Sequence, residues 1–110
     1  MPPKAAPLLQ GTLDLIVLQL LRAEPTNGYD LSLRIQATSS HVLSVNAGSL
    51  YPALYRLEER GLIKAEWRDT PKGRRAKVYS LTASGRNQLA EQRQNWARFS
   101  GALASILETT

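Results

Sequence analysis

The sequence predicts a mainly helical chain with one small β-hairpin, and two patterns lead to this fold class. Apolar residues recur at helical spacing in four segments, whereas the alternation typical of a half-buried strand occurs only within residues 63–81. With 110 residues, the chain has the usual length of one domain. We therefore expect three helices, a hairpin and a long fourth helix.

The first two helices are expected over about residues 12–22 and 28–39. Apolar residues surround the first helix nearly completely, which is typical of a helix that is buried on more than one side. The second helix has two apolar stripes, one of which contains Tyr29 and Leu33. We therefore expect it to pack against two neighbours, and we assign Tyr29 to the core.

The third helix is expected in the stretch "SLYPALYRLEERGLI", residues 49–63. Asn46 and Ser49 are both good N-caps, and Pro52 favours the later start because proline is best tolerated in a first turn. Gly61 is expected to end the helix in the left-handed conformation. Three leucines form its buried stripe, while the opposite face carries hydroxyl groups, a proline and arginines.

A β-hairpin follows, with strands expected over about 63–68 and 76–81. In the first strand, apolar residues alternate with charged ones, as in a half-buried strand. The second strand is apolar on both faces in part. The loop between the strands contains Lys72, Arg74 and Arg75.

Thr82 is expected to cap a final helix that runs from about Ala83 to Glu108. Apolar residues recur on it with the a and d spacing of a heptad repeat, interrupted only at Gln92. Such a seam predicts pairing of two copies of the helix. The residues expected at this dimer seam are Leu89, Trp96, Phe99, Leu103 and Ile106.

The net charge of +5 is confined to residues 56–86, which hold nine basic and four acidic residues. This concentration favours a polyanion partner, although a solubilising surface would give the same count. The chain has no cysteine, one histidine in a polar loop (His41) and no glycine-rich phosphate loop. We therefore expect no enzyme activity, no metal and no cofactor. Neither a signal peptide nor a membrane span is evident, so we expect a cytoplasmic protein without membrane contact.

The order of the elements predicts a winged helix-turn-helix, in which the third helix enters the major groove of DNA and the hairpin forms the wing. This placement explains the polar outer face of the third helix. Tyr51 could instead be only half-buried beside the leucines, and Arg74 and Arg75 could form only a solvated turn. The residues expected to contact DNA are Asn46, Ser49, Tyr51, Pro52, Tyr55, Arg56, Lys72, Arg74, Arg75 and Lys77.

With these elements in this order, the sequence resembles the PadR family of bacterial transcriptional regulators. The resemblance extends over nearly all of residues 10–90 and lies in the stretches "GTLDLIVLQLL", "NGYDL", "SLYPALYRLEERGLI", "GRRAKVYSLT" and "SGRNQL". The chain looks like the short subfamily with a single C-terminal helix. We accordingly expect a flexible arm over 1–9, a winged helix-turn-helix over 10–81 and a dimerisation helix over 82–110.

The resemblance implies a homodimeric repressor that a small aromatic or amphipathic compound releases from DNA. A two-fold dimer predicts a palindromic operator. Two Trp96 side chains facing each other across the dimer could hold a flat aromatic molecule, with Phe99 and Ile16 lining the walls. Simple packing of Trp96 in the seam is the alternative. A second alternative concerns the whole chain, because a winged-helix module that binds an acidic protein would carry the same positive charge.

Overall fold

The computed structural model describes residues 10–109, and the arm expected over residues 1–9 lies outside this range. The fold is mainly helical with one small antiparallel sheet, which confirms the predicted class. No helix within the described range is both long and apolar enough to cross a bilayer. In chain order the elements are α1 (Gln10–Ala23), β1 (Thr26–Asn27), α2 (Gly28–Thr38), α3 (Ala47–Glu59), β2 (Ile63–Asp69), β3 (Arg75–Leu81) and α4 (Ala83–Leu107).

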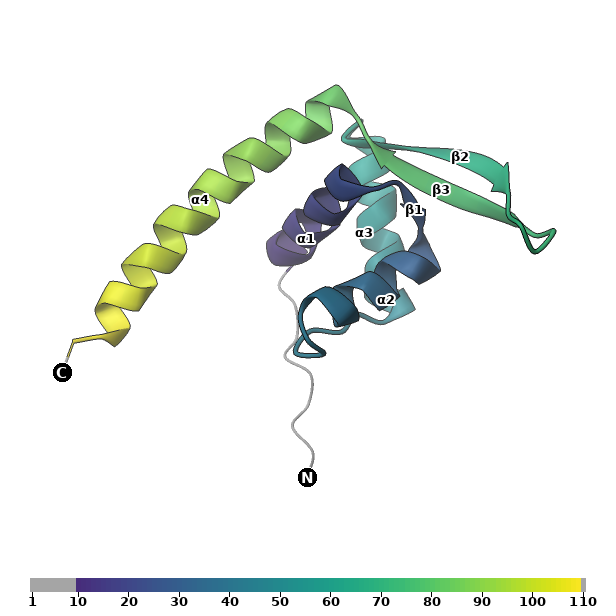
Figure 1. Ribbon diagram of the computed structural model, residues 1–110. Helices are drawn as coiled ribbons and strands as arrows, with labels where there is room; N and C mark the ends of the chain where they lie inside the picture. Colours follow the sequence, from purple (N-terminus) through teal and green to yellow (C-terminus); the bar gives the residue numbers. More distant parts are fainter. Residues whose placement is uncertain (1–9, 110) are drawn as a thin grey trace.

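Helix α1 lies at the centre of the molecule, between α4 on one side and α2 and α3 on the other (Figure 1). Its apolar residues are buried on several sides, as expected from a helix that is apolar nearly all round. Val17 and Leu18 are fully buried. From α3, the core receives Leu50, Ala53, Leu54 and Leu57.

Side-chain caps begin three of the helices. The Asn46 Oδ1 atom accepts a hydrogen bond from the Ser49 amide at 2.9 Å, so α3 begins at Ala47. The later start at Ser49, which Pro52 favoured, is wrong, and Pro52 lies in the second turn of the helix. Thr82 caps α4 as predicted, because its Oγ1 atom accepts from the Gly85 amide at 3.0 Å. Gly61 ends α3 with a φ of +73°, also as predicted.

The sheet has the strand order β1-β3-β2, and all its pairs are antiparallel. Strand β1 was not expected, because Thr26 and Asn27 lie in a stretch with turn chemistry and are too few to show a period. They pair with Tyr79 and Val78 on the outer edge of β3, so the wing is attached directly to the start of α2.

Three apolar residues are exposed where the sequence pattern predicted burial. On β2, Ile63 is buried but Trp67 is 61% exposed, because the hairpin extends beyond the core (Figure 1). On α2, Tyr29 and Leu33 are 67% and 46% exposed, since no described element covers that face. The assignment of Tyr29 to the core is therefore wrong for this chain.

Helix α4 packs against the body through its N-terminal part (Figure 1). Leu89, expected at the dimer seam, is instead buried in the core of its own chain. Beyond it the helix projects away from the body (Figure 1), and its apolar residues are exposed. These exposed residues include Trp96, Phe99, Leu103 and Ile106.

Gly85 fixes the angle at which α4 leaves the body, because a Cβ atom there would overlap the backbone carbonyl oxygen of Leu62. We expect Gly85→Ala to lower the free energy of unfolding by about 1–3 kcal/mol, the usual cost of overpacking. On the same helix, a Cβ at Gly101 meets nothing, and we expect Gly101→Ala to raise stability by about 0.5–1 kcal/mol. Urea unfolding measures the free energy of unfolding of both variants. Equal changes in the two variants would contradict the close packing of Gly85.

Candidate nucleic-acid interface

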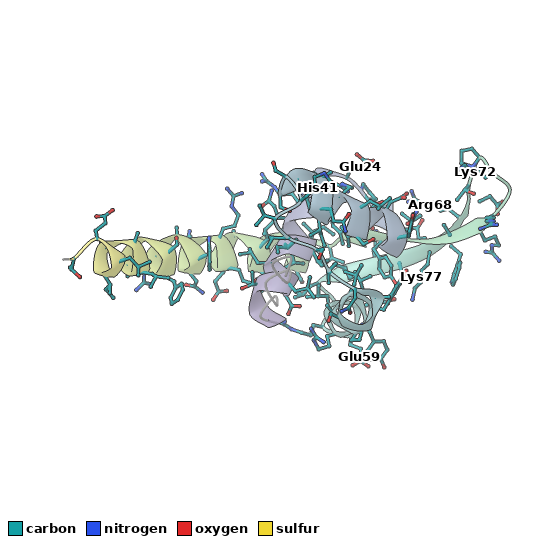
Figure 2. The ribbon with its side chains drawn as sticks, turned by 90° about the horizontal axis from the view of Figure 1, so that it is seen from below. Glu24, His41, Glu59, Arg68, Lys72 and Lys77 are labelled. Carbon is teal, nitrogen blue, oxygen red and sulfur yellow. The ribbon has the colours of Figure 1, made fainter. Side chains whose placement is uncertain are left out.

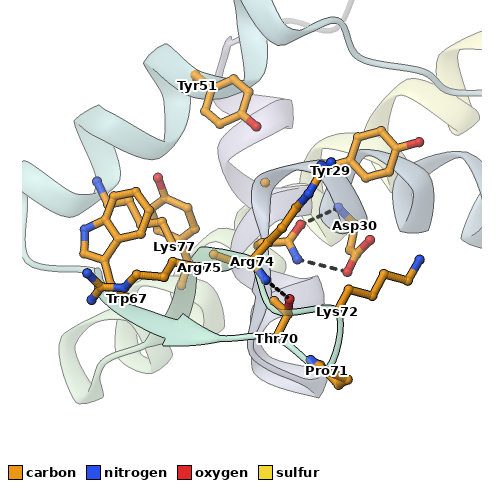
Figure 3. A pocket seen from close by; sticks show the side chains of 14 residues that line it. Tyr29, Asp30, Tyr51, Trp67, Thr70, Pro71, Lys72, Arg74, Arg75 and Lys77 are labelled. Atoms are coloured by element: carbon orange, nitrogen blue, oxygen red, sulfur yellow. Dashed lines mark hydrogen bonds between the residues drawn. The ribbon is translucent and has the colours of Figure 1, made fainter.

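A concave groove of about 890 Å³ lies between the inner face of the wing and the start of α2, with Tyr51 of α3 at its edge. Figure 3 shows the side chains that surround this groove, with Trp67, Arg75 and Lys72 from the wing and Tyr29 and Tyr51 from α2 and α3. The groove brings together half of the residues that were expected to contact DNA. These are Tyr51, Lys72, Arg74, Arg75 and Lys77.

Tyr51 packs against the first residue of α2. A Cβ atom at Gly28 would lie 2.8 Å from the Cε1 atom of the Tyr51 ring, so only glycine leaves room for the tyrosine there. The Tyr51 residue nevertheless remains 47% exposed. The tyrosine is therefore supported by α2 on one side and open to the groove on the other.

Two cations on the inner face of the wing are held by aromatic and acidic neighbours. The guanidinium of Arg75 lies 6.0 Å from the centroid of the Trp67 ring, and its Nε atom is 4.0 Å from Asp69 Oδ1. The Lys77 ammonium lies 5.4 Å from the centroid of the Tyr79 ring. Cation–aromatic contacts of this kind orient the charge without neutralising it.

Lys77 also joins the wing to α3, because its Nζ atom lies 3.5 Å from Glu58 Oε1. Burial acts to lower the pKa of Lys77, but the combined effects of Tyr79 and Glu58 outweigh it and raise the pKa. Lys77 therefore stays charged and serves as a link between the wing and α3 as well as lining the groove.

Lys72 and Arg74 lie on the loop between β2 and β3 and are exposed. Figure 2 shows Lys72 at the tip of the wing, far from α4. Neither side chain forms an ion pair with any residue in the described part of the chain. Both cations are therefore available to a partner, as is Lys64 on β2, which is also exposed and outside the ion pairs of the described residues.

Four further residues expected at DNA lie outside the groove, on the exposed surface of α3 and its cap. Asn46 and Ser49 are joined by the capping hydrogen bond, and Pro52 is exposed. The Tyr55 hydroxyl donates a hydrogen bond to Glu59 Oε1 at 3.0 Å, and this bond raises the pKa of Tyr55.

Arg56 is placed differently from the sequence expectation. Its guanidinium turns toward α1, where Nη2 lies 3.4 Å from Asp14 Oδ1, and the side chain is 37% exposed. The sequence pattern grouped it with the outer face of α3, because its position on the helix is at the border between the two faces. Its partner Asp14 lies 42 residues earlier in the chain, so the sequence around Arg56 does not indicate the ion pair.

The groove also contains residues that the sequence reasoning did not assign to it. The alternation of side chains along the strands would have been enough to predict that Trp67 lies in the groove. Side chains at alternate positions share a face of the hairpin, and cross-strand pairing places Trp67 opposite Lys77. Tyr29 and Gly28 lacked such a signal, since their approach to the wing depends on the unexpected strand β1. Elsewhere, among the described residues, no three potential ligand side chains gather into a metal site.

The residues expected to bind a ligand are only partly brought together. A cavity of about 500 Å³ lies between α1, α2 and α4, and both Ile16 and Trp96 line it. Phe99 lies outside this cavity and borders a neighbouring depression with Trp96. The Trp96 and Phe99 ring centroids are 6.0 Å apart.

Comparison with known proteins finds transcriptional regulators both by sequence and by structure. The Transcriptional regulator PadR-like family matches residues 17–91. The transcriptional regulator Rv3488 of Mycobacterium tuberculosis is 44% identical over 59 residues, which cover 54% of each chain, so the match spans about half of that relative.

Solved structures resemble the chain over a larger share of its length. A transcriptional regulator from Clostridium thermocellum has a TM-score of 0.83 at 25% identity, covering 90% of this chain and 96% of the other. A PadR-like transcriptional regulator from Bacillus cereus has a TM-score of 0.81 at 29% identity, covering 93% and 97%. Family members are transcriptional regulators rather than enzymes, which confirms the expected absence of enzyme activity. The chain belongs to the PadR-like family of transcriptional regulators.

Proposed function

We propose that the chain is a homodimeric repressor that binds a palindromic operator in duplex DNA through α3 and the wing. The observation that carries this proposal is the groove, bordered by Tyr51 of α3, between the start of α2 and a wing whose tip cations, Lys72 and Arg74, form no ion pair within residues 10–109. In this proposal residues 10–81 form the DNA-binding unit and residues 82–110 form the dimerisation helix.

The exposed face of α3 suits the major groove, and the wing suits the phosphate backbone. Ser49, Pro52 and Tyr55 lie on the side of α3 that faces away from the core and offer hydroxyl and apolar groups to base edges. The first amides of α3 add partial positive charge for a phosphate. Lys72 and Arg74 then contact the backbone farther along the duplex, where they contribute affinity without reading sequence.

Dimerisation is supported by the apolar face of α4. Trp96, Phe99, Leu103 and Ile106 are each at least 42% exposed, although Trp96 and Phe99 also border depressions next to α1. Pairing with a second copy would bury this face by the hydrophobic effect, which is the main driving force of protein association. The two α3 helices would then be related by a two-fold axis and require inverted half-sites in the operator.

We predict that Phe99→Asp combined with Ile106→Asp converts the dimer into a monomer, because it places four charges in the paired seam. Light scattering measures the mass, and selection of bound duplexes from a random pool measures the preferred site. The wild type should select two inverted half-sites about 34–36 Å apart or a multiple of this, and the variant only single half-sites.

Gln94→Asp combined with Ser105→Asp is the matched control, since it adds the same charges at exposed positions of α4 outside the seam. A seam variant that remains dimeric would remove α4 from the interface. A wild type that enriches no sequence at all would refute sequence-specific DNA binding and favour an acidic protein as the partner.

We predict that Lys72→Ala combined with Arg74→Ala weakens binding to all duplexes by the same factor. In the dimer the double substitution removes two phosphate contacts from each copy, four in all, which should reduce the slope of log affinity against log salt by about 3.6, at about 0.9 per contact. Fluorescence anisotropy with the selected operator and a shuffled duplex measures both quantities. Arg22→Ala combined with Arg98→Ala removes the same charge outside the groove and should leave the slope unchanged. A wild-type slope in the wing variant would contradict the role of the wing tip.

A ligand that controls binding is proposed for the cavity beside Trp96. Its volume lies within the usual range for small-molecule sites, about 300–1,000 Å³, and its walls are largely apolar. Among the described residues that line it, Arg93 is the one that carries a charge. The cavity therefore suits an aromatic or amphipathic molecule, with an acidic group preferred by Arg93.

We predict that 8-anilinonaphthalene-1-sulfonate, an aromatic sulfonate, quenches Trp96 in a Trp67→Phe background, where Trp96 is the only tryptophan. Arg93→Gln should weaken this binding, because it removes the partner of the sulfonate. Arg98→Gln, on the same helix but outside the cavity, should not. Saturating probe should also lower operator affinity, typically about 5–150-fold for coupled sites. If the emission of Trp96 does not change when the probe is added, the ligand proposal is wrong and Trp96 serves only to pack the dimer seam.

A further inference from the structure

The interior of the protein contains one charged residue that the DNA-binding proposal does not use. Asp14 of α1 is only 7% exposed, and no other charged residue in the range 10–109 is buried. Its ion-pair partner is Arg56 of α3, at 3.4 Å, and Arg60 adds a weaker attraction. Desolvation outweighs both attractions, so the pKa of Asp14 is raised. The pair therefore connects the central helix to the helix that is proposed to read DNA.

This ion pair is a poor source of stability. The Arg56 Nε atom is buried and has no hydrogen-bond partner, so part of the desolvation of the guanidinium is uncompensated. The Asp14 carboxylate is buried while the Arg56 side chain is 37% exposed. Ion pairs with buried groups can often be replaced by apolar residues of similar volume without loss of stability. A contribution other than stability is therefore needed to account for the pair.

A charged pair differs from apolar packing in being directional. Leu50, Leu54 and Leu57 hold α3 to the core through contacts that are non-directional and roughly proportional to buried area. The Asp14–Arg56 pair instead joins one atom of α1 to one atom of α3. On the wing side of α3, Glu58 is joined to Lys77 at 3.5 Å. Rotation of α3 about its axis would stretch both links.

We propose that Asp14 and Arg56 are positioning residues that fix the orientation of α3 on α1, so that discrimination between operator and unrelated DNA depends on them. The inference rests on the proposed function of α3 as the reading helix. It reassigns Arg56, which acts through α1 rather than by touching DNA. Affinity for the phosphate backbone does not depend on the pair, because the wing supplies that affinity.

The test uses Asp14→Asn combined with Arg56→Met, which removes both charges, leaves the net charge unchanged and keeps side chains of similar length. The measured quantity is the ratio of affinities for the duplex selected by the wild type and for a shuffled duplex. Unfolded protein lowers both affinities by the same factor, so a purely structural effect cancels in this ratio. We expect the ratio to fall about tenfold, with the shuffled-duplex affinity and the salt slope unchanged.

The control is Glu66→Gln combined with Arg68→Met, which removes an ion pair of similar length, 3.3 Å, whose side chains are half-exposed. It should keep the wild-type ratio. If the buried double variant does not fold by circular dichroism, Arg56→Lys replaces it, because lysine keeps the charge but lacks the planar fork. Its ratio should fall with the salt slope unchanged.

Two results overturn the inference. A folded variant with the wild-type ratio shows that α3 is oriented without the pair. A salt slope reduced by about 1.8, at about 0.9 for the Arg56 of each copy in the dimer, shows that Arg56 contacts a phosphate directly. Failure of the proposed function is distinguishable from both, because the wild type itself would then show no preference between the two duplexes.

Discussion

The burial of α1 is the constraint on which the rest of the structure depends. Val17 and Leu18 are completely buried, and the helix packs against α2, α3, α4 and β3 (Figure 1). Because interiors are close-packed, a helix in this position cannot shift without moving its neighbours. The helix proposed to read DNA and the helix proposed to bind a second copy are therefore held by the same element, although they lie on opposite sides of it.

Helix α1 also lines the cavity that contains Trp96, and this arrangement gives a physical route for regulation. Ile16 and Leu20 face the cavity, while Asp14, two residues before Ile16, pairs with Arg56 of α3. A molecule that displaced the cavity wall would thus act on a helix that is joined to α3 by a directional contact. Coupling between two sites requires a structural element whose position is affected by both of them. Helix α1 is the element that the cavity and α3 share.

Features set by local chemistry were predictable from the sequence, whereas features set by distant neighbours were not. The cap at Thr82 and the left-handed turn at Gly61 depend on residues within one helical turn, and both were predicted. The exposure of Trp67 depends on how far the hairpin extends beyond the core, which no local pattern encodes. The inward turn of Arg56 depends on Asp14 in another helix. Lys72, Arg74, Arg75 and Lys77 meet in one groove because the strand period and the loop chemistry place the wing residues locally. Tyr51 joins them through its packing against Gly28 in another helix.

The distribution of charge shows why a count of cations overstates the positive surface open to a partner. The segment 56–86 holds nine basic residues, but four of them form ion pairs within the chain. Of these, Arg56 turns inward and Lys77 connects the wing to α3, whereas Lys72 and Arg74 at the wing tip have no acidic partner in the described structure. Each internal pair reduces the positive potential that a phosphate would meet at that position. The five basic residues of the segment outside these pairs are Arg60, Lys64, Lys72, Arg74 and Arg86, and two of them lie at the wing tip. Orientation of α3 and affinity for the DNA backbone are thus assigned to different cations of the same basic segment.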